Sequence, residues 1–358
     1  MHTPTVGPNS AGHLRSRARR NGLALGAVLV LLAACADNSS SADDTDATVA
    51  AASSTAAPTT AAAPTTTEAP TTTVEVTTTI PRPVNPLEDQ PEPELVSEDG
   101  YGFLDGIAWS KEEGALFFTD AEGQLLRLGA DDSVSVERSD VKTRDFQFDS
   151  SGRIIATETD DLRVTATNAD GTVDILAADF EGLKFAAPNG VAVRSDGTVY
   201  FTDFVPGAEP GFDFRGVFSI SPTGVVTAVH RYPADQGPNG IALSPDEKTL
   251  YVGNSFGASV EMFDIAPDGS VSAEPRQKMT TTGVPDGICV DDAGNIFVAS
   301  IMVGVEAFDS AGTPLGTVAF PSPELGTPGQ LSNCEVGGED GRTLFVLSAT
   351  ALYRVPLA

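Results

Sequence analysis

The chain has 358 residues and a formal net charge of −29, with 21 Lys and Arg against 50 Asp and Glu. Nucleic-acid affinity rests largely on basic side chains that neutralise phosphate, so this charge balance argues against a nucleic-acid-binding protein. His2 and His13 lie close to the N-terminus, which leaves His230 as the only histidine in the remainder. One imidazole cannot build a multi-histidine zinc site or a histidine relay.

Residues 1–34 have the pattern of an export signal. Four arginines between positions 15 and 20 precede an apolar run over residues 23–34, which is too short to cross a bilayer as a helix. The following stretch, Leu-Ala-Ala-Cys ending at Cys35, resembles a bacterial lipobox. We expect cleavage before Cys35, diacylation of its thiol and attachment to the outer face of the cell membrane by lipid alone. The alternative is an ordinary signal cleavage followed by a chance cysteine.

Residues 35–94 are dominated by Thr, Ala and Pro. Between positions 45 and 79, 14 of 35 residues are Thr. Such a composition buries too little apolar surface to offset the chain entropy lost on folding. We therefore expect a disordered linker that separates the lipid anchor from a folded domain at residues 95–358.

The folded domain repeats one pattern six times: a polar residue, an alternating apolar strand, a turn with Gly or Asp, and a second strand. The copies begin at Asp105, Asp145, Asn189, Asn239, Asp286 and Ser332. A period of 40 to 50 residues without helical patterning predicts an all-β, six-bladed β-propeller. The last copy has only three strand candidates, so we expect a strand near residues 94–97 to complete it and to protect its edge.

The residue that precedes each innermost strand should lie at the same end of the central channel. In four copies this residue is Asp105, Asn189, Asn239 or Asp286. Two carboxylates and two carboxamides on one axis form an oxygen-ligand set of the kind that Ca²⁺ prefers. The alternative is ordinary turn chemistry, since Asn-Gly and Asp-Gly are common turn pairs. The shared position in the repeat favours a divalent-cation site.

Three segments carry a family resemblance: PNGVAVRSDGTVYFTDF at 188–204, PNGIALSPDEKTLYV at 238–252 and PDGICVDDAGNIFVA at 285–299. Together they resemble the senescence-marker-protein/gluconolactonase/luciferin-regenerating (regucalcin-like) family. The resemblance implies a six-bladed propeller with an axial divalent metal, bound by Glu, Asn, Asn and Asp, that hydrolyses lactones or related esters.

Residue by residue, the resemblance assigns metal binding to Asn189, Asn239 and Asp286, with substrate contact also at Asn189 and a catalytic base at Asp286. The first metal ligand is shortened from Glu to Asp105, and an aspartate that follows the family's blade-three Asn is Gly190 here. Arg144 stands where the family often has a substrate-contacting Asn. This arginine either binds an acidic substrate or pairs with Asp145.

No Ser-His-Asp triad is available, because His230 lies outside the start of any innermost strand and is expected on an outer part of a blade. Cys289 and Cys334 fall in innermost strands, where we expect two buried thiols that pack as small apolar side chains, in preference to nucleophiles or a disulfide. Trp109 is expected to pack between blades.

Two functions are consistent with these features of the sequence. The first is a lipid-anchored, metal-dependent lactonase or esterase, a monomer with a small-molecule substrate and one Ca²⁺. The second is a non-catalytic propeller that binds a small ligand or a protein through the same face of the channel. A metal-independent enzyme of the strictosidine-synthase type fits less well, because it would leave the four oxygen ligands without a role.

Overall fold

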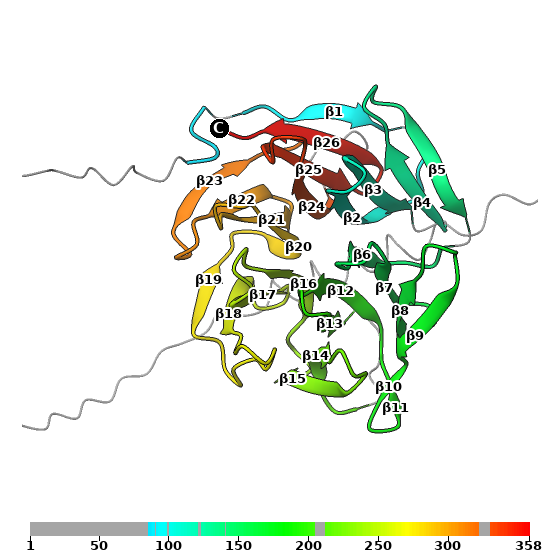
Figure 1. The fold of residues 1–358 in the computed structure, drawn as a ribbon. Coiled ribbons are helices and arrows are strands. Elements are labelled where there is room, and N and C mark those ends of the chain that lie inside the picture. Colours follow the sequence, from blue (N-terminus) through cyan, green and yellow to red (C-terminus); the bar gives the residue numbers. More distant parts are fainter. Residues whose placement is uncertain are drawn as a thin grey trace, which may run out of the picture.

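The computed structural model describes residues 85–89, 91–98, 100–120, 123–139, 141–204, 212–321 and 330–358. The predicted signal peptide, Cys35 and residues 36–84 of the predicted linker lie outside these residues. Within them the protein is all-β, and no helix is long and apolar enough to cross a membrane. Six four-stranded antiparallel sheets surround a central axis, which confirms the predicted six-bladed propeller (Figure 1).

The first three blades follow the chain from the axis outward, each strand pairing with the next. Blade 1 contains β2 (Leu104–Ser110), β3 (Ala115–Asp120), β4 (Gln124–Leu128) and β5 (Val134–Ser139). Blade 2 contains β6 (Asp145–Phe148), β7 (Ile154–Glu158), β8 (Arg163–Thr167) and β9 (Val173–Ala177). A small hairpin of β10 (Asp179–Phe180) and β11 (Leu183–Lys184) then leads to blade 3, which contains β12 (Pro188–Val193), β13 (Val199–Asp203), β14 (Arg215–Ile220) and β15 (Val226–Tyr232).

Blades 4 and 5 repeat this order, and blade 6 closes the ring. Blade 4 contains β16 (Pro238–Leu243), β17 (Thr249–Asn254), β18 (Ser259–Asp264) and β19 (Gln277–Thr280). Blade 5 contains β20 (Val284–Val290), β21 (Ile296–Ile301), β22 (Gly304–Phe308) and β23 (Pro314–Val318). Blade 6 contains β24 (Leu331–Gly337), β25 (Thr343–Ser348), β26 (Ala351–Pro356) and, outermost, β1 (Glu94–Ser97).

The pairing of β1 with β26 confirms the predicted closing strand. Arg354 on β26 binds Glu94 on β1 at 2.8 Å and Asp132 of blade 1 at 2.7 Å. Just before β1, Leu87 is buried in the hydrophobic cluster between blades 5 and 6. The start of the domain therefore contacts blades 5 and 6, and β1 covers the outer edge of β26, which would otherwise be unpaired.

Innermost strands approach one another closely because glycine follows their first polar residue. In blades 1, 3, 4 and 5 the register with the second strand shifts at this point, and the glycines are Gly106, Gly190, Gly240 and Gly287. A Cβ on Gly240 would fall on the backbone carbonyl oxygen of Asp286 in the next blade. Only glycine fits there, and the bulge turns the preceding side chain toward the axis.

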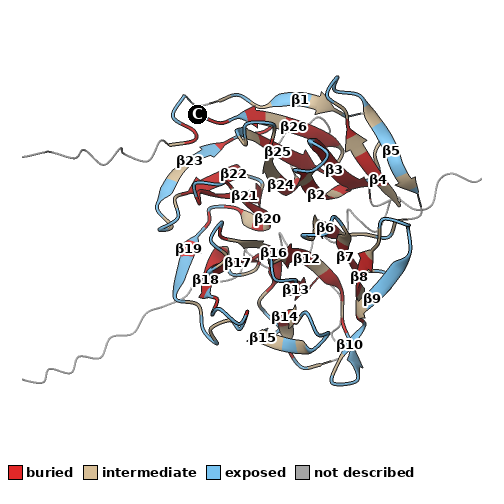
Figure 2. Cartoon of the chain, in the orientation of Figure 1, coloured by how far each residue is buried: buried red, intermediate tan, exposed pale blue. Residues whose placement is uncertain are grey.

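Burial decreases from the axis to the rim (Figure 2). The second strands β3, β13 and β17 are buried throughout, whereas the outermost β5 is largely exposed. As predicted, Trp109 packs between blades, stacked on Phe345 of blade 6 at a ring-centroid distance of 5.9 Å. His230 lies on the outermost strand β15 and contacts the carbonyl of Ala273 through Nδ1 at 2.8 Å, away from the axis as expected.

Candidate functional site

One polar side chain from each innermost strand reaches a common cavity on the propeller axis. We call these six residues the axial ring: Asp105, Asp145, Asn189, Asn239, Asp286 and Asn333. The cavity has a volume of about 20 Å³, which is room for one water molecule or one ion. The structure thus brings together the four predicted ligands, and it adds two members, Asp145 and Asn333, that sequence reasoning left out.

Asn189 has a defined amide orientation. Its Nδ2 donates a hydrogen bond to the backbone oxygen of Phe204 at 3.0 Å. A carbonyl oxygen can only accept, so the amide nitrogen must face Phe204 and the amide oxygen is directed elsewhere. No described residue donates a hydrogen bond to that oxygen, and Asn189 lines the axial cavity. An uncharged oxygen ligand is therefore available without any rearrangement.

The side-chain amide of Asn239 also has one defined orientation. Its Nδ2 lies 3.1 Å from Ser255 Oγ. The Ser255 hydroxyl donates its only proton to the carbonyl of Pro285 at 2.7 Å, so its oxygen can only accept from Asn239. The amide oxygen of Asn239 consequently points away from Ser255, and no described residue donates to it. The two predicted carboxamide ligands are both held with oxygen free.

Arg144 pairs with Asp105. Its Nη1 lies 2.8 Å from Asp105 Oδ2, and its guanidinium lies 5.9 Å from the ring centre of Phe103. The sequence-based alternative of a pair with Asp145 is therefore wrong, because the strand start turns the Asp145 carboxylate toward blade 3 instead. Burial raises the pKa of Asp105 above its ordinary value, against the opposing effect of the Arg144 charge.

Asp145 accepts a hydrogen bond from the backbone N–H of Val191 in blade 3 at 3.0 Å and one from Asn333 Nδ2 at 3.3 Å. Burial, together with the nearby Asp105 charge, raises the pKa of Asp145 to about 7. The signal that could have found this residue was its position: Asp145 opens the second copy of the repeat. It differs from the others because Phe146, not glycine, follows it, and β6 begins without a register shift.

Asp286 is the third carboxylate of the axial ring. Burial and then the Asp105 carboxylate raise its pKa well above the ordinary value, while Arg144 and a hydrogen bond from Asn239 act in the opposite direction. Three acids with raised pKa values share one arginine, so ionisation of all three is unfavourable unless a bound cation compensates their negative charge.

The donor set suits a hard divalent cation. Within the described segments no three His, Cys, Asp or Glu side chains form a metal-binding cluster, so carboxylates alone do not make the site. Carboxylate and carboxamide oxygens together give up to six oxygen donors around a cavity of ionic size, without nitrogen or sulfur ligands. This chemistry matches Ca²⁺ and is unlike the N/S ligand sets preferred by zinc.

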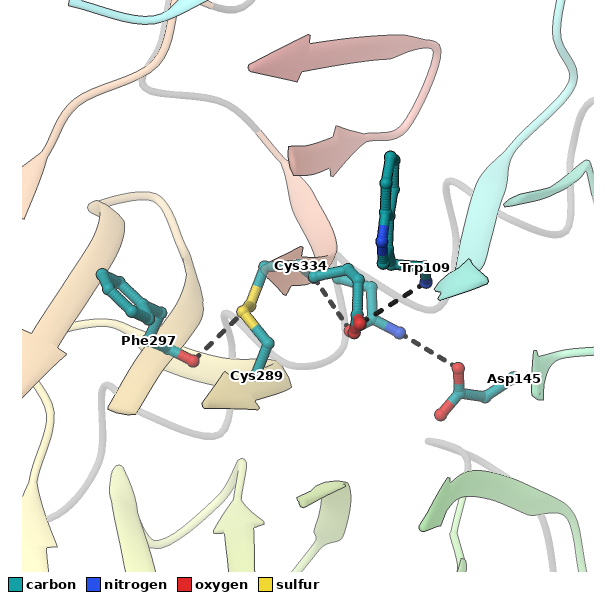
Figure 3. The surroundings of a disulfide bond; sticks show 7 residues. Trp109, Asp145, Cys289, Phe297 and Cys334 are labelled. Atoms are coloured by element: carbon teal, nitrogen blue, oxygen red, sulfur yellow. Dashed lines mark hydrogen bonds between the residues drawn. A yellow bond between two sulfur atoms is a disulfide. The ribbon is translucent and has the colours of Figure 1, made fainter. Parts of the chain in front are cut away.

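Cys289 and Cys334 form a disulfide with a Cα–Cα distance of 5.7 Å (Figure 3). The expectation of two separate buried thiols is therefore wrong. The two cysteines lie on β20 and β24, the innermost strands of adjacent blades, and blade packing brings together residues that are 45 positions apart in sequence. Both side chains are buried, as the sequence indicated.

Glu335, also on β24, lies near the other end of the channel, where it lines a separate depression with Trp109. Its Oε1 is 3.4 Å from the backbone nitrogen of Trp109, and burial raises its pKa to about 8. Sequence reasoning did not single out this residue, because nothing in its local pattern distinguishes it from other blade carboxylates.

The family model for the SMP-30/gluconolactonase/LRE-like region matches residues 103–350. The chain belongs to this family. The match covers all six innermost strands and hence the whole axial ring.

Individual relatives agree with this assignment. A gluconolactonase of Zymomonas mobilis is 33% identical over 199 residues, which are 51% of this chain and 53% of that protein. The lactonase drp35 of Staphylococcus aureus is 27% identical over 62% of this chain and 71% of its own length. A gluconolactonase structure from Xanthomonas campestris superposes with a TM-score of 0.64 at 28% identity, over 75% of this chain and 90% of the other. The chain thus spans about half the length of the first of these curated relatives.

Proposed function

We propose that this protein is a metal-dependent hydrolase of lactones or related esters, with one Ca²⁺ bound at the axial ring. The observation that carries the proposal is the fixed orientation of Asn189 and Asn239, whose free oxygens face the same ion-sized cavity as Asp105 and Asp286. Two of the relatives described above are named gluconolactonase and lactonase, which supports the same reaction class.

Lactone hydrolysis adds water to the ring carbonyl and breaks the ring C–O bond, giving a hydroxy acid. A bound divalent cation supplies Lewis-acid polarisation of the carbonyl. Asp286 is the candidate base: it accepts the proton of the attacking water and returns a proton to the leaving alkoxide. Asp105, Asn189 and Asn239 complete the cation ligands, and Asp145 and Asn333 close the ring beside them.

Arg144 and Asn189 are the proposed substrate contacts. Arg144 makes one described ion pair, to Asp105, and is half-buried beside Phe103, so further guanidinium donors remain for a ligand. A cation at this position favours lactones that carry a carboxylate or another acidic group. Asn189 holds its amide nitrogen on Phe204 and contributes only its oxygen.

The location proposed is the outer face of the cell membrane, with the protein anchored through a diacylated Cys35 and acting as a monomer. The Cys289–Cys334 disulfide supports export, because disulfides persist in oxidising compartments. Replacing Cys35 by Ser and fractionating cells tests the anchor: the variant should leave the membrane fraction. An equally membrane-bound variant would contradict the lipid attachment.

The catalytic proposal is tested by metal analysis and lactone hydrolysis. The purified protein should contain one divalent cation per chain and hydrolyse sugar lactones in a pH-stat assay. Asp286→Ala should lower kcat at least about 100-fold, the contribution typical of a positioned base. Asp246→Ala, which changes an exposed aspartate in a blade turn, is the matched control and should retain activity. A protein without bound divalent cation would overturn the proposal.

One observation favours the non-catalytic alternative: Asp105 is already paired with Arg144 and could leave the cation with fewer charged ligands. Stoichiometric Ca²⁺ without turnover of sugar lactones, aryl esters or organophosphates would support a binding propeller instead.

A further inference from the structure

Neighbouring blades are joined close to the axis by polar contacts that differ from junction to junction. At four of the six junctions a hydroxyl of one blade donates to a backbone oxygen of the next. These contacts are Thr157 to Asn189, Thr202 to Asn239, Ser255 to Pro285, and Ser332 to Leu104. In all four the acceptor belongs to an axial-ring residue or to its immediate neighbour, so each hydroxyl also fixes the ring.

The two remaining junctions use other chemistry. Between blades 1 and 2, Arg144 binds Asp105. Between blades 5 and 6, the described residues of β20 and β24 make no hydroxyl-to-carbonyl hydrogen bond across the junction, and the Cys289–Cys334 disulfide joins them instead. The disulfide therefore stands where the other junctions place a hydrogen bond or an ion pair.

The disulfide is next to the axial ring on both of its strands. Cys289 lies three residues after Asp286 on β20, and Cys334 directly follows Asn333 on β24. Asn333 packs on the backbone of Gly287, where a Cβ would collide with the Asn333 amide. The same amide donates through Nδ2 to Asp145 and accepts the N–H of Cys334 through Oδ1 (Figure 3).

This geometry connects the disulfide to two carboxylates. Holding β24 against β20 seats Asn333 on Gly287, which fixes the backbone beside Asp286. It also fixes the donor that Asn333 presents to Asp145 of blade 2. A separation of the two strands would release both contacts, whereas the hydrogen bonds at the other junctions would remain.

We propose that the Cys289–Cys334 disulfide is a positioning element of the cation site, which holds Asp286 and Asn333 in the arrangement required for binding. The inference rests on the proposed function for its cation but makes a separate claim about strand geometry. Groups that orient metal ligands from outside typically change metal affinity by about 10 to 100-fold when they are removed.

The experiment compares wild type with the double variant Cys289→Ser/Cys334→Ser. Metal-free protein is titrated with Ca²⁺ by calorimetry, and amide hydrogen exchange is followed in peptides from residues 284–290 and 331–337. The double variant should bind Ca²⁺ about 10-fold more weakly. Its exchange should be faster in both peptides and unchanged in β12 and β16.

Reduction of folded wild type provides a second route that needs no substitution. Dithiothreitol converts the disulfide to two thiols and is itself oxidised to its cyclic disulfide, so two electrons and two protons are transferred. Reduced wild type should reproduce the weaker affinity and faster exchange, and reoxidation should restore both.

Val346→Ala is the matched control. Val346 is fully buried in the same hydrophobic cluster as both cysteines, and its side chain makes no hydrogen bond to the axial ring. It should lower the melting temperature and leave Ca²⁺ affinity unchanged. If the double variant lowers only the melting temperature, with wild-type affinity and exchange, the disulfide is merely structural and the inference fails. If wild type binds no Ca²⁺, the proposed function fails, while the exchange data still decide whether the disulfide orders β20 and β24.

Discussion

The axial ring has a neutral part and a charged part that are held by different means. Asn189 and Asn239, in blades 3 and 4, are fixed by Phe204 and Ser255 within their own blades. The carboxylates of blades 1, 2 and 5 contact groups of other blades: Arg144 for Asp105, Val191 and Asn333 for Asp145, and Asn239 for Asp286.

The carboxamides and the carboxylates therefore have different roles in the cation site. The carboxamides present their oxygens whether or not a cation is bound, so they set the position of the site. The carboxylates are buried close together, and their raised pKa values mean that each needs a proton, an arginine or a cation to lower its energy. We infer that the neutral part preorganises the site and that the charged part supplies the driving force for cation binding.

The largest effect is expected from a substitution that disrupts the close packing of two innermost strands. Gly240→Ala places a Cβ on the carbonyl oxygen of Asp286, a backbone atom that cannot move aside cheaply. We expect a loss of roughly 3 to 5 kcal/mol in unfolding free energy, measured by urea denaturation, together with loss of Ca²⁺ binding. Gly253→Ala is the control in the same blade, because its Cβ would meet only contacts of 3.4 Å or longer. Equal stability of the two variants would contradict the close approach of β16 and β20.

The second prediction concerns the carboxyl group of Asp145 and the pH dependence of stability. In metal-free protein the pKa of Asp145 is raised from 3.8 to about 7, so the folded state holds a proton that the unfolded state has lost. This contribution to stability is present at low pH and declines as pH rises through this window. We expect a loss of roughly 2 kcal/mol between pH 5 and pH 7 from this group.

Asp145→Asn keeps an acceptor for the Val191 N–H and should flatten this part of the pH dependence, measured by urea denaturation in a chelating buffer. Added Ca²⁺ should stabilise wild type more at pH 8 than at pH 5, because protons compete with the cation. A wild-type curve that rises between pH 5 and pH 7 would show that the buried carboxylates are not the controlling groups.

The smallest effect concerns Arg144. Its positive charge lies 2.8 Å from a proposed cation ligand, so Arg144→Gln should tighten Ca²⁺ binding about 10-fold in calorimetry, or about 1.4 kcal/mol. Arg153→Gln, which removes a comparable pair with Asp149 in a blade turn, is the control and should have no effect. Weaker Ca²⁺ binding in Arg144→Gln would instead assign Arg144 the role of holding Asp105 in place.

The fold could be predicted from the sequence because a propeller is built from local units. Each copy carries its own strand, turn and strand, so the period alone located the innermost strands. The missing fourth strand of the last copy was enough to predict β1. The Asn-Gly and Asp-Gly pairs located four members of the axial ring for the same local reason.

The remaining features depend on how blades meet. Three such contacts join different blades. They are the disulfide, the pairing of Arg144 with Asp105 in place of Asp145, and the packing of Asn333 on Gly287. A repeat pattern contains no information on these contacts, since it specifies each blade separately. Asp145 was omitted because its copy lacks the glycine that marked the others, although its place in the repeat was known.

The closing strand also determines how the domain responds to mechanical force. The chain enters the described domain at Asn85, whose side chain donates to the carbonyl of Leu315 in blade 5. It then runs along blade 6 as β1, and Arg354 links Glu94 to Asp132 of blade 1. A pull transmitted from the preceding chain would load these contacts in succession, and peeling of residues 85–97 would dissipate it at the rim. The cation site, on the axis, would be shielded until blade 6 had lost its outermost strand.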